Sequence, residues 1–119
     1  MKDFRTLTVW EKSHRLALAL YSATRSFPKD ELFGLTSQMR RAGSSIPTNI
    51  AEGCGRNSDP DFARFLQIAF GSACEVEYHL ILSHELEYLT PSQYSLLNED
   101  LMEVKKMLAS LIAKIRADC

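Results

Sequence analysis

The chain has 119 residues, of which 45% are apolar and 24% are charged, and its formal net charge is −1. A chain of this length can bury roughly two-thirds of its unfolded surface around one core, so we expect a single domain over residues 1–119. The sequence contains neither a run of about 18 to 20 apolar residues that would span a bilayer nor the apolar stretch of a signal peptide near its start. We therefore expect no membrane partner.

The cysteines are three in number, Cys54, Cys74 and Cys119. An odd number without CxxC or another metal-ligand spacing fits free thiols in a reducing compartment better than a disulfide framework. This pattern favours a cytoplasmic location.

Charge is unevenly distributed along the chain. Residues 1–58 hold nine bases and five acids, whereas residues 59–119 hold five bases and ten acids. Such a chain can neutralise itself internally, dock head to tail on copies of itself, or offer its basic half to phosphate. Two solvated faces without a partner are an equally weighted alternative.

The first predicted helix runs from about Thr8 to Arg25 and stops before Phe27-Pro28, because the residue before a proline disfavours helical backbone. Its expected inward residues are Val9, Trp10, Ala17, Leu20 and Tyr21. The second predicted helix runs from about Asp30 to Gly53. Its expected apolar seam is Leu32, Leu35, Met39, Ala42, Ile46 and Ile50.

Pro47 interrupts this second helix. Proline has no N–H to donate to the carbonyl of Gly43 and pushes against it, so we expect a kink between these two residues. Ser44 and Ser45 are expected to bond the loosened backbone. Two separate helices are the alternative to one bent helix.

The third predicted helix follows Asp59-Pro60, which we interpret as a cap and a first-turn proline. Its apolar seam is Phe62, Leu66, Ala69, Ala73, Val76 and Leu80. Its centre is built of small residues, namely Ala69, Gly71, Ser72, Ala73 and Cys74. A glycine inside a helix costs about 1 kcal/mol relative to alanine, so we expect a neighbouring backbone to approach Gly71 closely.

The fourth predicted helix starts with a capping box, in which Thr90 is the N-cap, Pro91 occupies the first helical position and Gln93 follows three residues after the cap. Its a/d seam is Tyr94, Leu97, Leu101, Val104, Leu108, Leu111 and Ile115. Short turns join the four helices, which makes sequential helices antiparallel neighbours. We therefore predict an all-α fold, an antiparallel up-down-up-down four-helix bundle whose second helix is kinked near Pro47.

Residues with catalytic or metal-binding chemistry are sparse. A di-iron site would need paired Glu-x-x-His motifs, which the sequence lacks. Glu75 and His79 stand one turn apart and His84 lies further along the helix, so a mononuclear site completed by Glu52 is a minor alternative. His14, His79 and His84 fit surface or boundary positions better. Ser44, Ser45, Ser72 and the three cysteines have no neighbouring base that the sequence can place, so we predict no enzyme, no catalytic or metal site and no cofactor.

The segment 38–56 stands out because its polar residues recur every three to four positions and so share one stripe of a helix. This polar stripe comprises Gln38, Arg41, Ser45, Asn49, Glu52 and Arg56. We interpret it as an inter-helix or inter-subunit network that includes a Glu52–Arg56 ion pair. The alternative is a phosphate-binding patch of Arg40, Arg41, Arg56 and Arg64. We favour the network, because four arginines are few and no aromatic platform for bases accompanies them.

Several motifs together resemble a known family. They are the Val9-Trp10-Glu11-Lys12 opening, the Phe27-Pro28-Lys29-Asp30-Glu31 turn, Gly34-Leu35-Thr36-Ser37-Gln38-Met39-Arg40-Arg41-Ala42, Ser45-Ile46-Pro47-Thr48-Asn49-Ile50-Ala51-Glu52-Gly53, and the later Phe65, Ala69, Gly71-Ser72 and Glu75. This pattern is similar to the bacterial four-helix bundle proteins named for open reading frames in 23S rRNA intervening sequences. The resemblance covers almost the whole chain.

The resemblance implies a four-helix bundle that assembles as a homopentameric ring, in a family most of whose members have no assigned enzymatic activity. A related branch, the accessory variability proteins of diversity-generating retroelements, binds nucleic acid and partners a reverse transcriptase. Those proteins look strongly basic, whereas this chain is slightly acidic. We therefore expect a non-enzymatic homo-oligomer whose first partner is itself. A nucleic-acid-binding accessory protein, bound to RNA, DNA or a nucleic-acid enzyme, is the alternative.

Overall fold

The computed structural model describes residues 2–118, and within them it contains helices and no β-strand. The elements in chain order are the 3-10 turn η1 (Phe4–Thr6), α1 (Thr8–Thr24), the 3-10 turn η2 (Lys29–Glu31), α2 (Leu35–Cys54), α3 (Asp59–Glu85) and α4 (Pro91–Ala117). The all-helical prediction is confirmed. None of the helices in this part of the chain has an apolar stretch long enough to cross a bilayer.

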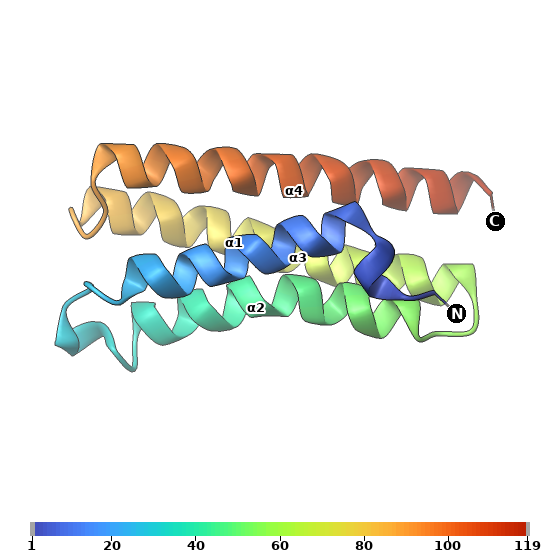
Figure 1. The fold of residues 1–119 in the computed structure, drawn as a ribbon, viewed down its shortest axis with the longest axis horizontal. Helices are drawn as coiled ribbons and strands as arrows, with labels where there is room; N and C mark the ends of the chain where they lie inside the picture. The colour runs from blue at the N-terminus through green and yellow to red at the C-terminus, as the bar shows by residue number, and fades with distance from the viewer. Residues whose placement is uncertain (1, 119) are drawn as a thin grey trace.

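The four helices form an antiparallel bundle in which each helix packs against two others, α1 on α2, α2 on α3, α3 on α4 and α4 back on α1. Figure 1 shows the chain running up and down the long axis, with both ends of the chain on the same side of the bundle. The body measures 45 × 23 × 20 Å, so its length is close to that of its longest helices, about 40 Å for 27 residues. The predicted up-down-up-down bundle is confirmed.

The helix α2 starts later than expected, at Leu35 instead of Asp30. The chain first makes the separate turn η2, and Glu31 then accepts a hydrogen bond from the N–H of Leu35 at 3.2 Å through its carboxylate, which satisfies one of the free amides at the helix start. Leu32 consequently lies before the helix and is half exposed, so its expected place in the core is wrong.

Pro47 lies buried inside α2, and the helix continues through it as one element. The single-helix interpretation is therefore correct, and the kink itself stays a prediction. Of the two serines expected to bond the loosened backbone, Ser44 bonds a backbone carbonyl and Ser45 bonds another side chain. Ser44 Oγ donates to the Arg41 carbonyl at 3.2 Å, and Ser45 Oγ reaches across to α3.

The core draws apolar side chains from all four helices. The α3 seam is buried as predicted over its whole length, from Phe62 to Leu80. In α4 the predicted Ile115 is buried, but Ile112 is buried in place of the predicted Leu111, which is half buried. A straight helix has 3.6 residues per turn, so positions that follow a strict seven-residue repeat rotate away from the core by about 20° per heptad. The four-residue step from Leu108 to Ile112 turns the apolar seam back toward the core. In α1, Leu16 is buried and the predicted Tyr21 is exposed.

The predicted N-cap is confirmed for α4 and is wrong for α3. Thr90 and Gln93 form the capping box: Gln93 N donates to Thr90 Oγ1 at 3.1 Å, and Thr90 N donates to Gln93 Oε1 at 2.9 Å. At α3 the N-cap is Ser58, not Asp59. Ser58 has extended backbone and accepts the N–H of Asp61 at 3.3 Å, so Asp59 is already the first helical residue.

Close backbone approach occurs at other glycines than expected. Gly71 is exposed, and a methyl group added there would have no atom of the chain within 4 Å. Within the bundle, the predicted close approach at Gly71 is therefore wrong. The tight positions are Gly43, where an added methyl would lie 2.6 Å from Leu20 Cδ1, and Gly53, where it would lie 2.9 Å from Phe65 Cβ.

Candidate interaction site

The middle of the polar stripe links α2 to α3. Ser45 Oγ and Ser72 Oγ lie 2.8 Å apart, and Asn49 Nδ2 donates to both the hydroxyl of Ser45, at 2.9 Å, and its carbonyl, at 2.8 Å. These three half-buried side chains satisfy one another at the edge of the core. Ser45 and Asn49 thus act between helices of the same subunit.

The outer members of the stripe are arranged differently. The side chains of Gln38, Arg41 and Glu52 are exposed and form no hydrogen bond or ion pair within residues 2–118. The expected Glu52–Arg56 pair is wrong, because α2 ends at Cys54 and Arg56 turns toward the first turn of α3. There Arg56 Nε lies 3.8 Å from Asp61 Oδ2. Three of the six stripe residues are therefore free to contact another molecule.

The four arginines of the alternative patch fall into two groups. Arg40 and Arg41 are separated from Arg56 and Arg64 by most of α2, about 20 Å along its axis. Arg40 Nε donates to Thr24 Oγ1 at 2.8 Å, and the guanidinium lies 4.9 Å from the Tyr21 ring centre. Arg40 therefore already has partners on α1.

Arg56 and Arg64 both contact the same acid and the same ring. They form ion pairs with Asp61, and their guanidinium groups lie 4.6 and 4.7 Å from the Phe65 ring centre. Arg41 alone of the four makes no contact of this kind in the described part of the chain. The structure therefore does not bring the four guanidinium groups into one continuous patch.

The histidines do not form a metal site within residues 2–118, where no group of three or more His, Cys, Asp or Glu side chains is placed to hold an ion. His79 Nε2 lies 3.8 Å from Glu75 Oε2, and Glu52 does not join them. His79 is only 5% exposed, so it is buried and does not hold the expected surface or boundary position. Its Nδ1 is buried without a hydrogen-bond partner. Burial lowers the pKa of His79, and the nearby Glu75 carboxylate opposes this shift only in part.

The other two histidines pack on aromatic rings. His14 is exposed and stacks on Trp10 with 5.1 Å between ring centres, and His84 is half buried with its ring centre 4.5 Å from that of Tyr94. These rings contribute packing at the surface of the bundle.

The cysteines that the structure describes, Cys54 and Cys74, are free thiols. Cys54 is buried at the end of α2, and burial raises the pKa of its thiol. Cys74 is exposed on α3. Cys119 lies outside the described residues.

An apolar groove of about 490 Å³ runs along the outside of α1 and α2, and we call it the α1–α2 groove. Its main apolar lining is Phe4, Trp10, Ala17, Leu18, Tyr21 and Pro47. The small residues Ala17, Pro47 and Ala51 leave the groove hollow, whereas Leu18 and Tyr21 are 57% and 42% exposed. Sequence reasoning missed this groove.

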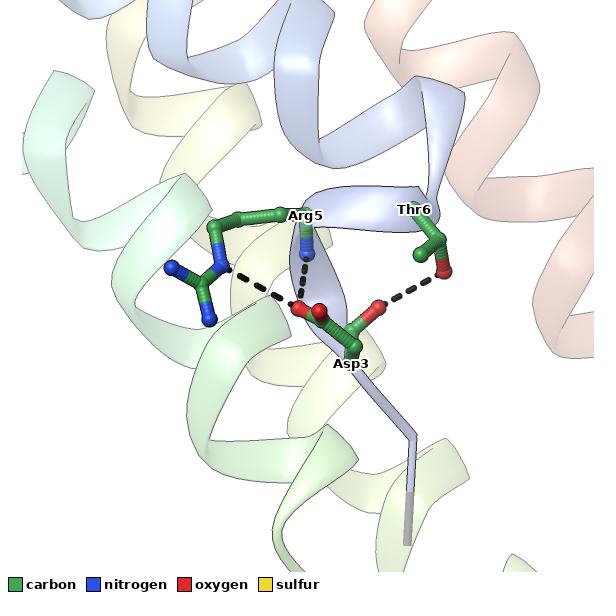
Figure 2. A network of polar contacts seen from close by, with 3 residues as sticks. All are labelled: Asp3, Arg5 and Thr6. Atoms are coloured by element: carbon green, nitrogen blue, oxygen red, sulfur yellow. Dashed lines mark hydrogen bonds and ion pairs between the residues drawn. The ribbon is translucent and has the colours of Figure 1, made fainter.

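The turn η1 builds one wall of this groove. Figure 2 shows the Asp3 carboxylate accepting hydrogen bonds from Arg5 N at 3.0 Å and Arg5 Nε at 3.2 Å, while Thr6 Oγ1 donates to the Asp3 carbonyl at 2.7 Å. The two hydrogen bonds from Arg5 lower the pKa of Asp3. The turn sets Phe4 against Trp10, with 5.0 Å between ring centres. An N-terminal segment that the apolar periodicity does not cover therefore completes the groove.

The outer side of α3 presents a second apolar surface. Ile68, Gly71, Glu75 and Tyr78 follow one another at spacings of three, four and three residues, so they share one face of the helix. Ile68 is 43% exposed, Tyr78 is 57% exposed, and the space in front of Gly71 is open. We call these four residues the α3 ridge.

The fold and these surfaces can be compared with known proteins. The sequence profile of the 23S rRNA-intervening sequence proteins matches residues 5–110, which is most of the chain. The chain belongs to the 23S rRNA-intervening sequence protein family. The match includes the α1–α2 groove from Arg5 onward, the whole polar stripe and the α3 ridge.

Among solved structures, the chain is similar to a protein of unknown function of the S23 ribosomal protein family from Bacteroides thetaiotaomicron VPI-5482. The two sequences are 35% identical, the match covers 88% of this chain and 95% of that one, and the TM-score is 0.81. No curated protein matches the chain. The comparison therefore shows the family and the fold of this 23S rRNA-intervening sequence protein without naming an activity.

Proposed function

We propose that this protein is a non-enzymatic, cytoplasmic assembly module that associates with copies of itself, with five copies as the stoichiometry that the family resemblance implies. The observation that carries the proposal is the α1–α2 groove, an apolar hollow flanked by large exposed side chains such as Leu18 and Tyr21. Extended apolar hollows on a small protein mark interaction sites, because apolar surface left in water is unfavourable.

The charge distribution supports self-association over another partner. The half of the chain that forms α1 and α2 is basic, and the half that forms α3 and α4 is acidic. Complementary charges on two faces of one molecule favour contact between copies, because the basic face of one subunit meets the acidic face of the next. The unpartnered Arg41 and Glu52 are candidates for polar contacts at such an interface.

The absence of catalysis is part of the proposal. The side chains that could act as nucleophile or base lie apart, with Cys74 on the outside of α3 and His79 buried beside Glu75. Catalysis by a nucleophile needs a base within hydrogen-bond reach of it. Assembly accounts for the exposed apolar surface without invoking a reaction.

The test is the mass of the purified protein in solution. Size-exclusion chromatography with light scattering is expected to give an integer multiple of the 13.5-kDa chain, about 68 kDa for five copies. Arg41→Ala or Glu52→Ala is expected to lower this mass or the melting temperature. Arg15→Ala is the matched control, because Arg15 is exposed and pairs only with Glu11 on its own helix. A 13.5-kDa species at every concentration would overturn the proposal.

A second candidate function is nucleic-acid binding through Arg40, Arg41, Arg56 and Arg64. Arg41 supports it, since this exposed guanidinium has no partner in residues 2–118, whereas the other three already make contacts within the chain. Phosphate contacts make binding fall steeply with salt. Retention on RNA or DNA at ~50 mM salt that is lost as salt rises would support this function, and no retention at that salt would exclude it.

A further inference from the structure

We propose that a second groove, between the start of α1 and the C-terminal half of α4, binds a free long-chain fatty acid through its carboxylate and its aliphatic chain. We call it the α1–α4 groove. Its volume is about 430 Å³, which is typical of sites for small molecules. The inference goes beyond self-association, because it names a ligand of another chemical class and a surface that the self-association proposal does not use.

The floor of the α1–α4 groove is aliphatic. Leu7 and Val9 form it at the start of α1, and Met107 and Leu111 form it on α4. Val9 is buried and the other three are half buried, so the floor presents apolar side chains to solvent. Among the described residues that line the groove, none has an aromatic ring. Such a floor favours a flexible aliphatic chain over a planar ring, and removal of both apolar surfaces from water would drive binding.

The path of the chain before α1 leaves this floor uncovered. The turn η1 packs on α1 and α2 and not on α4, and Figure 1 shows it leading away from α4 toward α2. Leu111 was expected in the core, but Ile112 is buried in its place. Leu111 and Met107 lie four residues apart and so share one face of α4, beside the start of α1.

One side of the groove carries a row of free hydrogen-bond donors. Lys106, Ser110 and Lys114 follow one another every four residues, so they lie in line along about 12 Å of α4. All three are exposed, and their side chains form no hydrogen bond or ion pair within residues 2–118. No acidic side chain is among the described residues that line the groove. The groove is therefore positively charged.

Other lysines on these helices have acidic partners, and this contrast indicates an anionic ligand. Lys12 of α1 forms an ion pair with Glu103, and Lys105 Nζ lies 2.6 Å from Glu77 Oε1. The two lysines of the groove have no such partner, so charge complementarity selects an anion. A carboxylate can accept hydrogen bonds from their ammonium groups. A fatty acid joins this carboxylate to the aliphatic chain that the floor requires.

Two variants test the charge and the space of the groove separately. Lys106→Glu/Lys114→Glu replaces both ammonium groups by carboxylates, and Ser110→Trp fills the groove between them. All three positions are exposed, so the fold is expected to persist, as circular dichroism can verify. Arg25→Glu/Lys29→Glu is the matched control. Both of its positions are exposed, and they lie where α1 ends, at the other end of the bundle.

The assay is equilibrium dialysis of the purified full chain against dodecanoate, dodecan-1-ol and dodecylammonium, each below the concentration at which it forms micelles. One dodecanoate per chain is expected to bind the wild type. Its affinity should be at least about tenfold higher than that of the alcohol, because the alcohol lacks the charge, and dodecylammonium should bind most weakly. Decanoate, which is two methylenes shorter, should bind roughly 4 to 10 times more weakly than dodecanoate.

The variants locate the binding. Lys106→Glu/Lys114→Glu is expected to bind dodecanoate at least about tenfold more weakly and to prefer dodecylammonium. Ser110→Trp should weaken binding of both probes, and Arg25→Glu/Lys29→Glu should bind as the wild type does. Unchanged dodecanoate binding in either groove variant would overturn the proposal.

The wild type alone can also overturn the proposal. It fails if dodecanoate does not bind, or if dodecylammonium binds as tightly. Binding to phosphatidylglycerol vesicles without binding of free dodecanoate would assign the groove to a membrane surface and overturn the fatty-acid ligand. Because dialysis counts ligand per chain, its result is distinct from the mass measurement that tests self-association.

Discussion

Replacing Gly53 by alanine tests a tightly packed position between α2 and α3. An added methyl would lie 2.9 Å from Phe65 Cβ and 3.0 Å from Phe62 Cδ1, whereas carbon atoms in contact prefer about 3.5 to 4.0 Å. Phe65 Cβ is fixed by the backbone of α3, so the helices must separate to make room. Such overpacking costs about 1 to 3 kcal/mol, against a gain in helix propensity of at most about 1 kcal/mol.

The expected net loss is about 1 to 2 kcal/mol of unfolding free energy. For a chain of 119 residues this lowers the melting temperature by roughly 4 to 8 °C. Thermal melts followed by circular dichroism at one fixed chain concentration measure it. Gly55→Ala is the control, because the methyl there would lie at an ordinary 3.5 Å from the Glu52 carbonyl and φ is −83°. A Gly53→Ala variant that melts at or above wild type would refute the reasoning.

Three further substitutions test the core and its caps. The pKa of His79 is lowered from 6.5, so below about pH 6.5 the unfolded chain takes up a proton that the folded chain does not, and the folded state loses stability as the pH drops. The His79→Leu variant should lose less stability over the same pH range. An unchanged pH profile of the melting temperature would contradict this prediction. Thr90→Ala removes the acceptor for Gln93 N and should lower the free energy of unfolding, measured in urea, by about 1 kcal/mol. An unchanged free energy of unfolding would show that the cap does not stabilise the helix. Ile46→Ala should cost about 2 to 5 kcal/mol, because Ile46 is fully buried; a loss under 1 kcal/mol would indicate a core that collapses around the site.

Helix positions and the buried seams were largely predictable from sequence. The signals are local: the Thr90 capping box depends on residues three apart, and the α3 seam repeats apolar residues at helical spacing. Errors arise where two neighbouring candidates compete. Ser58 rather than Asp59 caps α3, because the extended backbone angles at Ser58 decide which of the two residues is the cap. Ile112 rather than Leu111 is buried, because the phase of the helix decides which of the two faces the core. In both cases the residue type alone does not distinguish the neighbours.

The candidate surfaces were less predictable, because they depend on contacts between distant segments. The stripe was recognised from its period, but only the structure shows that Ser72 of α3 bonds Ser45 while Arg56 turns to Asp61. The α1–α2 groove needs η1 to bring Phe4 onto Trp10, and no periodic pattern indicates such a turn. Exposure of Tyr21 likewise follows from the packing of α2 beside α1.

Native mass spectrometry of the unmodified chain tests self-association most directly, because it counts the subunits of each species. The proposal predicts a dominant ion series for a complex of about 68 kDa, the mass of five chains, that dissociates to single chains on activation. A spectrum of 13.5-kDa monomers alone, from solutions gentle enough to preserve a control oligomer, would contradict it.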